Sequence, residues 1–199
     1  MRLKVPVALQ PNSYTCVSTS LKMVYDYFNE VLKGDLNLDI DEISKSIGTT
    51  EDGTDFDDIE KINSNPKILI SMHSVEVIAK YGNYGLSDIE NEINNGRPAI
   101  AWILPPEAKN RYYEHSVVIT GVDRDKYTVY CNDPFHGEKE IKLGEFMSLW
   151  SATDRTLIKF KVGKRVQRLL DEWIRELNAP EEKKETDYDL VNDIEVLLK

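Results

Sequence analysis

A cysteine at the expected start of a helix is the first feature of this sequence that indicates chemistry. Cys16 follows Ser13 and Thr15, which are common at helix starts, and apolar residues then recur at helical spacing over about 15–32. The unpaired amide hydrogens and positive dipole potential of a helix N-terminus stabilise a thiolate and lower the pKa of a cysteine. Cys16 is therefore predicted to be a nucleophile.

A side-chain amide precedes this cysteine by six residues. Gln10 can donate a hydrogen bond to the oxygen that becomes negative when a thiolate attacks a carbonyl, and the backbone amide of Cys16 can supply a second donor. One donor of such an oxyanion hole contributes about 3–4 kcal/mol. The pair alone does not identify a site, because a glutamine at this distance from a cysteine is common by chance.

A thiol nucleophile needs a base, and the sequence contains three histidines. His115 begins an apolar strand that runs to Gly121 and would hold its ring at a sheet edge, so it is the predicted base. The alternative for His115 is a histidine at a strand end whose ring only bonds a backbone carbonyl. His73 lies in an unassigned segment and His136 in a polar turn, and we expect both to be structural or exposed.

An acid that orients the histidine is expected from the hairpin that follows. The turn at 123–126 is centred near position 124.5, so facing residues have numbers that sum to about 249, and position 116 faces position 133. Asp133 is therefore predicted to lie across the hairpin from His115 and to hold one ring nitrogen, as the acid of a catalytic triad does. The alternative is an acid that only caps its own Asp-Pro turn.

The second cysteine, Cys131, shares a strand face with Asp133, because side chains alternate along a strand. A redox or metal role with Cys16 or His136 is an alternative, but we expect a small buried cysteine. Two cysteines are too few for a disulfide framework, and neither belongs to a Cys-x-x-Cys pair. No metal and no cofactor is expected.

The elements that must position these residues change character along the chain. Helical periodicity dominates the first half, with capping boxes predicted at Asp39–Glu42 and Ser87–Glu90, whereas period-two strands and turns dominate the second half. The segment 67–77 is apolar and unassigned. We expect helices at about 15–32, 40–47, 55–62, 88–95, 144–150 and 164–177, and strands at about 3–9, 98–104, 116–122, 127–132, 138–143 and 156–162. Helices followed by an antiparallel meander predict an α+β domain.

Charge and composition exclude several function classes. The 199 residues carry 25 basic and 35 acidic side chains, a net charge of −10 at pH 7, which would repel nucleic acid and anionic membranes. No apolar stretch approaches the ~20 residues of a membrane helix, and the start of the sequence lacks the apolar region of a secretory signal. We expect a cytoplasmic protein with no nucleic-acid and no membrane partner.

The length predicts one domain with an appendage. We expect the domain at 1–162 and a C-terminal helix with an acidic tail at 163–199, in which 180–187 is a solvated linker. The apolar cluster between Leu190 and Leu198 supports an alternative, a segment that docks on a protein partner or mediates self-association.

Four sequence blocks stand in a fixed order: Gln10–Met23, Gly96–Ile100, His115–Asp123 and Val129–Pro134. Together they resemble the bacteriocin-leader-processing (double-glycine) cysteine peptidases, numbered thirty-nine among the cysteine peptidase families, and their stand-alone relatives. The resemblance spans about 4–162 and implies a papain-like α+β fold, in which N-terminal helices pack with an antiparallel sheet. It also implies roles for four residues: Cys16 as nucleophile, His115 as general base and then acid, Asp133 as orienting acid and Gln10 as oxyanion donor.

The sequence departs from this family beside the cysteine and the histidine. Thr15, Val17 and Thr19 stand where the family usually has an acid, a glycine and an alanine, and Glu114 replaces a glycine often found before the histidine. We expect the β-branched Val17 to narrow the cleft and the charge of Glu114 to favour protonated His115.

The predicted function is cleavage of a peptide or isopeptide bond, in a peptide or protein substrate, through a thioester on Cys16. One alternative is a papain-like acyltransferase, in which an amine replaces water, and another is a catalytically silent module that binds peptides in the same cleft. Cleavage of double-glycine leaders is not predicted, because the family's leader peptidases are commonly fused to membrane transporters and this sequence contains neither a membrane span nor a nucleotide-binding motif.

Overall fold

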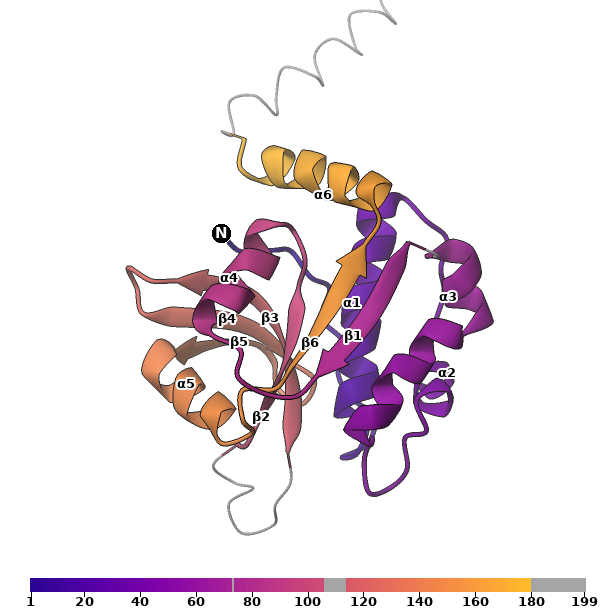
Figure 1. Ribbon diagram of the computed structural model, residues 1–199, viewed down its shortest axis with the longest axis horizontal. Coiled ribbons are helices and arrows are strands. Elements are labelled where there is room, and N and C mark those ends of the chain that lie inside the picture. The colour runs from indigo at the N-terminus through magenta and orange to yellow at the C-terminus, as the bar shows by residue number, and fades with distance from the viewer. Residues whose placement is uncertain (73, 106–113, 180–199) are drawn as a thin grey trace, which may run out of the picture.

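Helices occupy the first half of the chain and a six-stranded sheet most of the second (Figure 1). The computed structural model describes residues 1–72, 74–105 and 114–179. The elements are α1 (Cys16–Leu32), α2 (Ile40–Ser46), the 3-10 helix η1 (Phe56–Ser64), α3 (Pro66–Ser71), β1 (Val75–Lys80), α4 (Leu86–Asn94), β2 (Ala99–Ile103), β3 (His115–Asp123), β4 (Thr128–Asp133), β5 (Gly137–Lys142), α5 (Leu143–Ser151), β6 (Leu157–Val162) and α6 (Lys164–Leu177). None of these helices is long and apolar enough to cross a membrane.

The sheet is antiparallel throughout, with strand order β1-β6-β2-β3-β4-β5. Strands β2 to β5 are neighbours in both sequence and space, so the predicted meander is confirmed. Strand β6 returns to pair with β2, and β1 pairs with β6 at the edge. This arrangement confirms the predicted α+β class.

Helix α1 is the main element of the helical half and packs against β3. Its predicted apolar face is buried, namely Val17, Leu21, Val24 and Phe28. Figure 1 shows α1, α2 and α3 on one side of the molecule and the strands β3, β4 and β5 with α5 on the other. The residues at the start of α1 therefore lie between a helical half and a sheet half.

The strand predicted at 3–9 is wrong. Pro6 has no amide hydrogen to donate, and the segment makes separate hydrogen bonds rather than a ladder. Leu3 N donates to Thr120 O at 2.8 Å and Gln10 N to Pro134 O at 2.8 Å. These bonds tie the segment to the middle of β3 and to the turn after β4, and they bring Gln10 close to that turn.

The structure assigns one segment that the sequence left open and corrects one predicted capping box. The unassigned segment 67–77 contains most of α3 and the start of β1, a helix and a strand too short to leave a clear period. The capping box predicted at Ser87–Glu90 is also wrong, because the Asp88 carboxylate accepts the Gly85 amide hydrogen at 2.7 Å and Glu90 pairs with Arg124. The capping box at Asp39–Glu42 is confirmed.

Helix α6 contributes to the core of the described structure, since its Val166 and Leu170 are buried. Gly96 has a φ of 73°, and a Cβ built there would lie 2.9 Å from Ile174 Cδ1, so the backbone before β2 passes directly beneath the helix. The linker predicted at 180–187 and the apolar cluster at 190–198 lie outside the described residues.

We expect Leu170→Ala to lower the free energy of unfolding by about 2–5 kcal/mol, because it leaves a cavity under α6. Arg168→Ala, at an exposed position of the same helix, is the matched control and should change it by less than about 0.5 kcal/mol. Urea unfolding curves measure both values. If Leu170→Ala changed the free energy of unfolding by as little as Arg168→Ala, the packing of α6 would not stabilise the domain.

Candidate active site

No side chain of the N-cap residue satisfies the first backbone amides of α1. Thr15 is the N-cap, but its side chain makes no capping hydrogen bond to the helix amides and instead donates to Asn12 O at 3.1 Å. Cys16 is the first residue of the helix and is 8% exposed. Its sulfur therefore lies beside amide hydrogens that have no helical partner and that favour a negative charge.

His115 and Asp133 meet across the β3–β4 pair. His115 Nε2 lies 2.8 Å from Asp133 Oδ1. A carboxylate only accepts hydrogen bonds, so Nε2 carries the hydrogen and Nδ1 remains the ring nitrogen available to Cys16.

The hairpin arithmetic is wrong by about one residue, although the two side chains meet. The numbers of facing residues sum to 251 beside the turn, as for Val122 and Val129, and to 250 beyond the β-bulge between Ile119 and Gly121, so Val118 rather than Val117 faces Asn132. His115 itself pairs with Ile103 of β2. The hydrogen bond to Asp133 therefore runs diagonally between β3 and β4.

Burial and hydrogen bonding act in opposite directions on the three titrating groups. Burial raises the pKa of the Cys16 thiol, but hydrogen bonds with His115 and Ser116 and the charge of His115 bring it below the usual value. Burial lowers the pKa of His115, yet hydrogen bonds with Asp133 and Cys16 raise it to about 9. Burial also raises the pKa of Asp133, but hydrogen bonds from His115 and His136 hold it well below its usual range. These shifts favour a thiolate beside an imidazolium at neutral pH.

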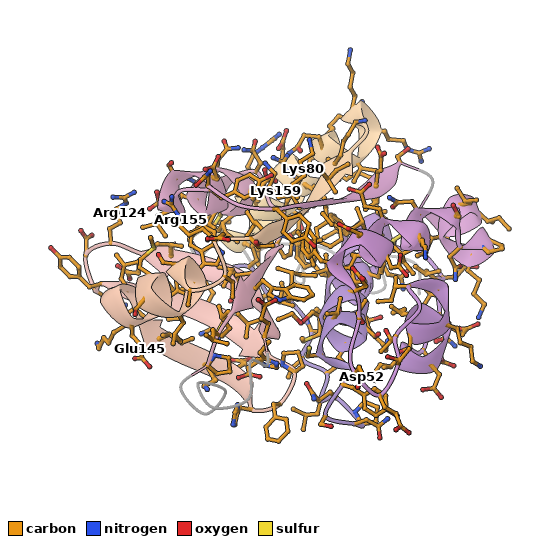
Figure 2. The ribbon with its side chains drawn as sticks, turned by 60° about the horizontal axis from the view of Figure 1, so that its bottom comes forward. Asp52, Lys80, Arg124, Glu145, Arg155 and Lys159 are labelled. Atoms are coloured by element: carbon orange, nitrogen blue, oxygen red, sulfur yellow. The ribbon has the colours of Figure 1, made fainter. Side chains whose placement is uncertain are left out.

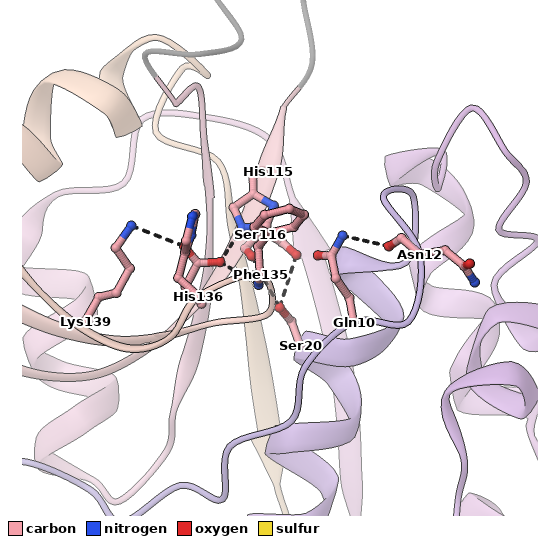
Figure 3. Close-up of polar contacts among 9 residues, drawn as sticks. Gln10, Asn12, Ser20, His115, Ser116, Phe135, His136 and Lys139 are labelled. Atoms are coloured by element: carbon pink, nitrogen blue, oxygen red, sulfur yellow. Dashed lines mark hydrogen bonds and ion pairs between the residues drawn. The ribbon is translucent and has the colours of Figure 1, made fainter.

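Gln10 lies on the loop side of the site, and its side-chain nitrogen donates to Asn12 O at 2.7 Å (Figure 3). An amide nitrogen carries two hydrogens, so one remains for another acceptor. The Gln10 side-chain oxygen is buried and has no hydrogen-bond partner among the described residues. The oxyanion role of Gln10 stays a prediction.

Two serines that sequence reasoning missed join α1 to β3. Ser20 Oγ and Ser116 Oγ lie 3.1 Å apart and are buried. Ser116 follows His115, and Ser20 follows Cys16 by about one helical turn. The sequence could not predict this contact, because serine is a common residue and the two serines are 96 positions apart.

Cys131 is buried in the core, whereas His136 lies beside Asp133. Cys131 is 0% exposed, and burial raises its pKa to about 12, which agrees with the expected inert core residue. The side chain of His136 is 56% exposed and contacts Asp133, a partner that sequence reasoning missed, and His73 lies outside the described residues. Within the described parts of the chain, no three His, Cys, Asp or Glu side chains form a group that could hold a metal ion.

Cavities flank the site on both sides. One of about 750 Å³ has a lining that includes Cys16 together with Glu51, Asp52 and Glu114, and that contains no lysine or arginine among the described residues. Another of about 410 Å³ lies beside His115 and Asp133 and has apolar walls that include Ile141 and Leu149. Figure 2 shows Asp52 of the first cavity and Glu145 of the second on opposite halves of the molecule.

The residues that depart from the family pattern also line the first cavity. Val17 is 1% exposed, so most of its side chain packs in the core rather than across the opening. The Glu114 carboxylate accepts a hydrogen bond from Trp102 Nε1, which directs it along the wall of the cavity.

Comparison with protein families finds a match to the family described as "Peptidase_C39 like family" over residues 2–158. Comparison with curated proteins finds no match.

Solved structures of two peptidases have a similar fold. A double glycine motif protease from an AMS/PCAT transporter, in complex with the leader peptide, has a TM-score of 0.58 and 22% identity, over 81% of this chain and 94% of that one. The peptidase domain of Streptococcus ComA, a bi-functional ABC transporter involved in a quorum sensing pathway, has a TM-score of 0.59 and 14% identity, over 79% and 98%. The papain-like fold expected from the sequence is thereby confirmed.

We expect iodoacetamide to modify Cys16 and not Cys131 at about pH 7, because only Cys16 has a lowered pKa. As the pH falls through that lowered pKa, the thiolate gains a proton and the rate of modification should decrease. Mass spectrometry of proteolytic peptides measures the extent of modification at each cysteine. Modification of Cys131 with Cys16 untouched would contradict the prediction.

The acidic lining predicts a charge preference in the same reaction. A cationic methanethiosulfonate should modify Cys16 about tenfold faster than an anionic one at low salt, and the ratio should fall as salt is added. Asp52→Asn should reduce the ratio, whereas Asp125→Asn, an exposed acid of the β3–β4 turn, should leave it unchanged. A ratio near one in the unaltered chain would rule out an electrostatic role for this wall.

Proposed function

The chain belongs to the peptidase C39-like family, and we propose that it is a cysteine peptidase that cleaves a peptide or isopeptide bond. Cys16 is the nucleophile, His115 the general base and then acid, and Asp133 the acid that orients the imidazole. Gln10 and the backbone amide of Cys16 donate to the oxyanion.

The observation that supports this proposal best is that buried His115 makes hydrogen bonds with both Asp133 and Cys16. Asp133 accepts the hydrogen of His115 Nε2 at 2.8 Å, and the hydrogen bond between His115 and Cys16 shifts the pKa of both groups toward their charged forms. All three side chains are buried. A histidine that only satisfied a backbone carbonyl would have neither of these side-chain partners.

In the first half of the reaction, the Cys16 thiolate attacks the carbonyl carbon of the substrate. The carbonyl oxygen becomes negative and accepts hydrogen bonds at the N-terminus of α1 and from Gln10. The intermediate collapses when the C–N bond breaks and the His115 imidazolium gives its proton to the leaving amine. The acyl group is then a thioester of Cys16.

In the second half, neutral His115 removes a proton from a water molecule, which attacks the thioester carbon. The C–S bond breaks, the carboxylic acid leaves, and Cys16 regains its pairing with protonated His115. Asp133 retains the hydrogen bond to Nε2 throughout, so the ring keeps one orientation in both halves. If an amine reaches the thioester first, the same residues carry out acyl transfer.

The substrate is a peptide or protein segment that lies across Cys16. The two cavities extend from Cys16 on one side and from His115 on the other, as a cleft for an extended chain requires. The complex of the double glycine motif protease with its leader peptide is consistent with a peptide ligand.

Activity-based labelling tests this proposal. A peptidyl epoxide should form an adduct with Cys16 in the unaltered chain, and His115→Ala should reduce the labelling rate by at least about 100-fold. Asp133→Asn should reduce it by a smaller factor, because it weakens orientation and leaves the proton carrier in place.

Circular dichroism should show that all variants are folded, and Cys131→Ser serves as the control that retains full labelling. A folded chain without any adduct would support the catalytically silent binding module instead. If His115→Ala is labelled at the unaltered rate, His115 is not the base.

A further inference from the structure

Two histidines share the carboxylate of Asp133 (Figure 3). Oδ1 accepts from His115 Nε2 and from the Phe135 amide, each at 2.8 Å. Oδ2 accepts from His136 Nδ1, also at 2.8 Å, and Lys139 Nζ lies 3.5 Å away. Asp133 is 4% exposed, so the protein rather than water fixes its direction.

We propose that His136 is a positioning residue for the reaction, and that its imidazole fixes the Asp133 carboxylate so that the other oxygen faces His115. This inference rests on the proposed function. It goes beyond it by assigning a task to a histidine whose polar side-chain partner among the described residues is Asp133.

Such a residue is needed because the carboxylate of an aspartate can rotate about its Cβ–Cγ bond. The bond between Cβ and Cγ of aspartate has a broad rotational preference, so bonds to a single oxygen leave the plane of the group poorly defined. A donor on Oδ2 fixes that plane. The His136 ring suits this task because it is short and rigid, and because it packs edge-on against Phe135 at 5.0 Å between ring centroids.

Lys139 is less suited to the same task. Its Nζ lies 3.5 Å from Oδ2 at the end of a flexible side chain that is 40% exposed, and an exposed ammonium contributes little fixed geometry. The other charged groups that line the cavity around His136 are Glu140 of β5 and Glu145 of α5. Neither bonds to Asp133, so the hydrogen bond from His136 is the short side-chain contact on this oxygen within the described residues.

The test compares two substitutions that both remove the imidazole ring. Asparagine can place its side-chain nitrogen near the position of His136 Nδ1 and keep a donor, whereas leucine has a similar bulk and no donor. Iodoacetamide modification of Cys16 is measured from about pH 5 to 10, where a shift of one pH unit in the profile corresponds to about tenfold in thiolate at its acid end.

We expect His136→Leu to slow modification about tenfold near pH 6 and to move the acid limb to higher pH, because His115 is held less well in its protonated form. His136→Asn should stay within about threefold of the unaltered chain. Glu138→Gln, on strand β5 but outside both cavities and paired with Arg2, should leave the profile unchanged.

A double-mutant cycle separates positioning from a general structural effect. In the Asp133→Asn background, His136→Leu should have little further effect, because its action passes through the Asp133 carboxylate. Equal losses in both backgrounds, equal losses in the leucine and asparagine variants, or an unaltered leucine profile would each overturn the inference.

The reactivity of the unaltered chain distinguishes this inference from the proposed function. If Cys16 does not react at neutral pH in that chain, both proposals fail. If it reacts and responds to His115→Ala but not to the change at His136, the proposed function stands and His136 is only a residue of the turn.

Discussion

The packing of α1 against β3 is the constraint on which the site depends. Ser20 and Ser116 meet in this interface at 3.1 Å, far from water. Cys16 is one turn before Ser20, and His115 directly precedes Ser116, so the contact fixes Cys16 and His115 relative to each other. A slide of either element by one residue would separate the thiol from the imidazole, and the close packing of the core resists such a slide.

Burial of each ionisable group in the site disfavours its charged form, and a hydrogen bond to a neighbouring group of the site stabilises that form. Burial disfavours the charged forms of Cys16, His115 and Asp133, yet hydrogen bonds among them reverse the net shift in every case. In a medium of low polarity such bonds are strong when both partners are present and costly when one is removed. The residues therefore act as a connected group, which extends through Asp133 to His136.

The two sides of the site have different chemistry because they belong to different halves of the fold. Glu51 and Asp52 belong to a tight turn in which Thr50 and Gly53 exchange backbone hydrogen bonds. Hydroxyl contacts that run from Thr49 to Ser18 attach this turn to α1. The other side is built from β4, β5 and α5 and is more apolar. The surface beside Cys16 is therefore acidic toward the helices and more apolar toward the sheet.

The sequence by itself determined the fold class, the meander and the long first helix, because helical periodicity and strand alternation are local properties. It also singled out His115 and Asp133, which the structure brings within 2.8 Å of each other, and Cys16, which it places at the start of α1. Gln10 precedes Cys16 by six residues, and in the structure its side chain donates to the Asn12 backbone oxygen. Only the tertiary structure decided the bulge in β3, the irregular path of residues 3–9, the contact of Ser20 with Ser116 and the second histidine on Asp133. These features depend on contacts between distant segments or on the geometry of a single turn, where the identity of a residue does not reveal which partner it will meet.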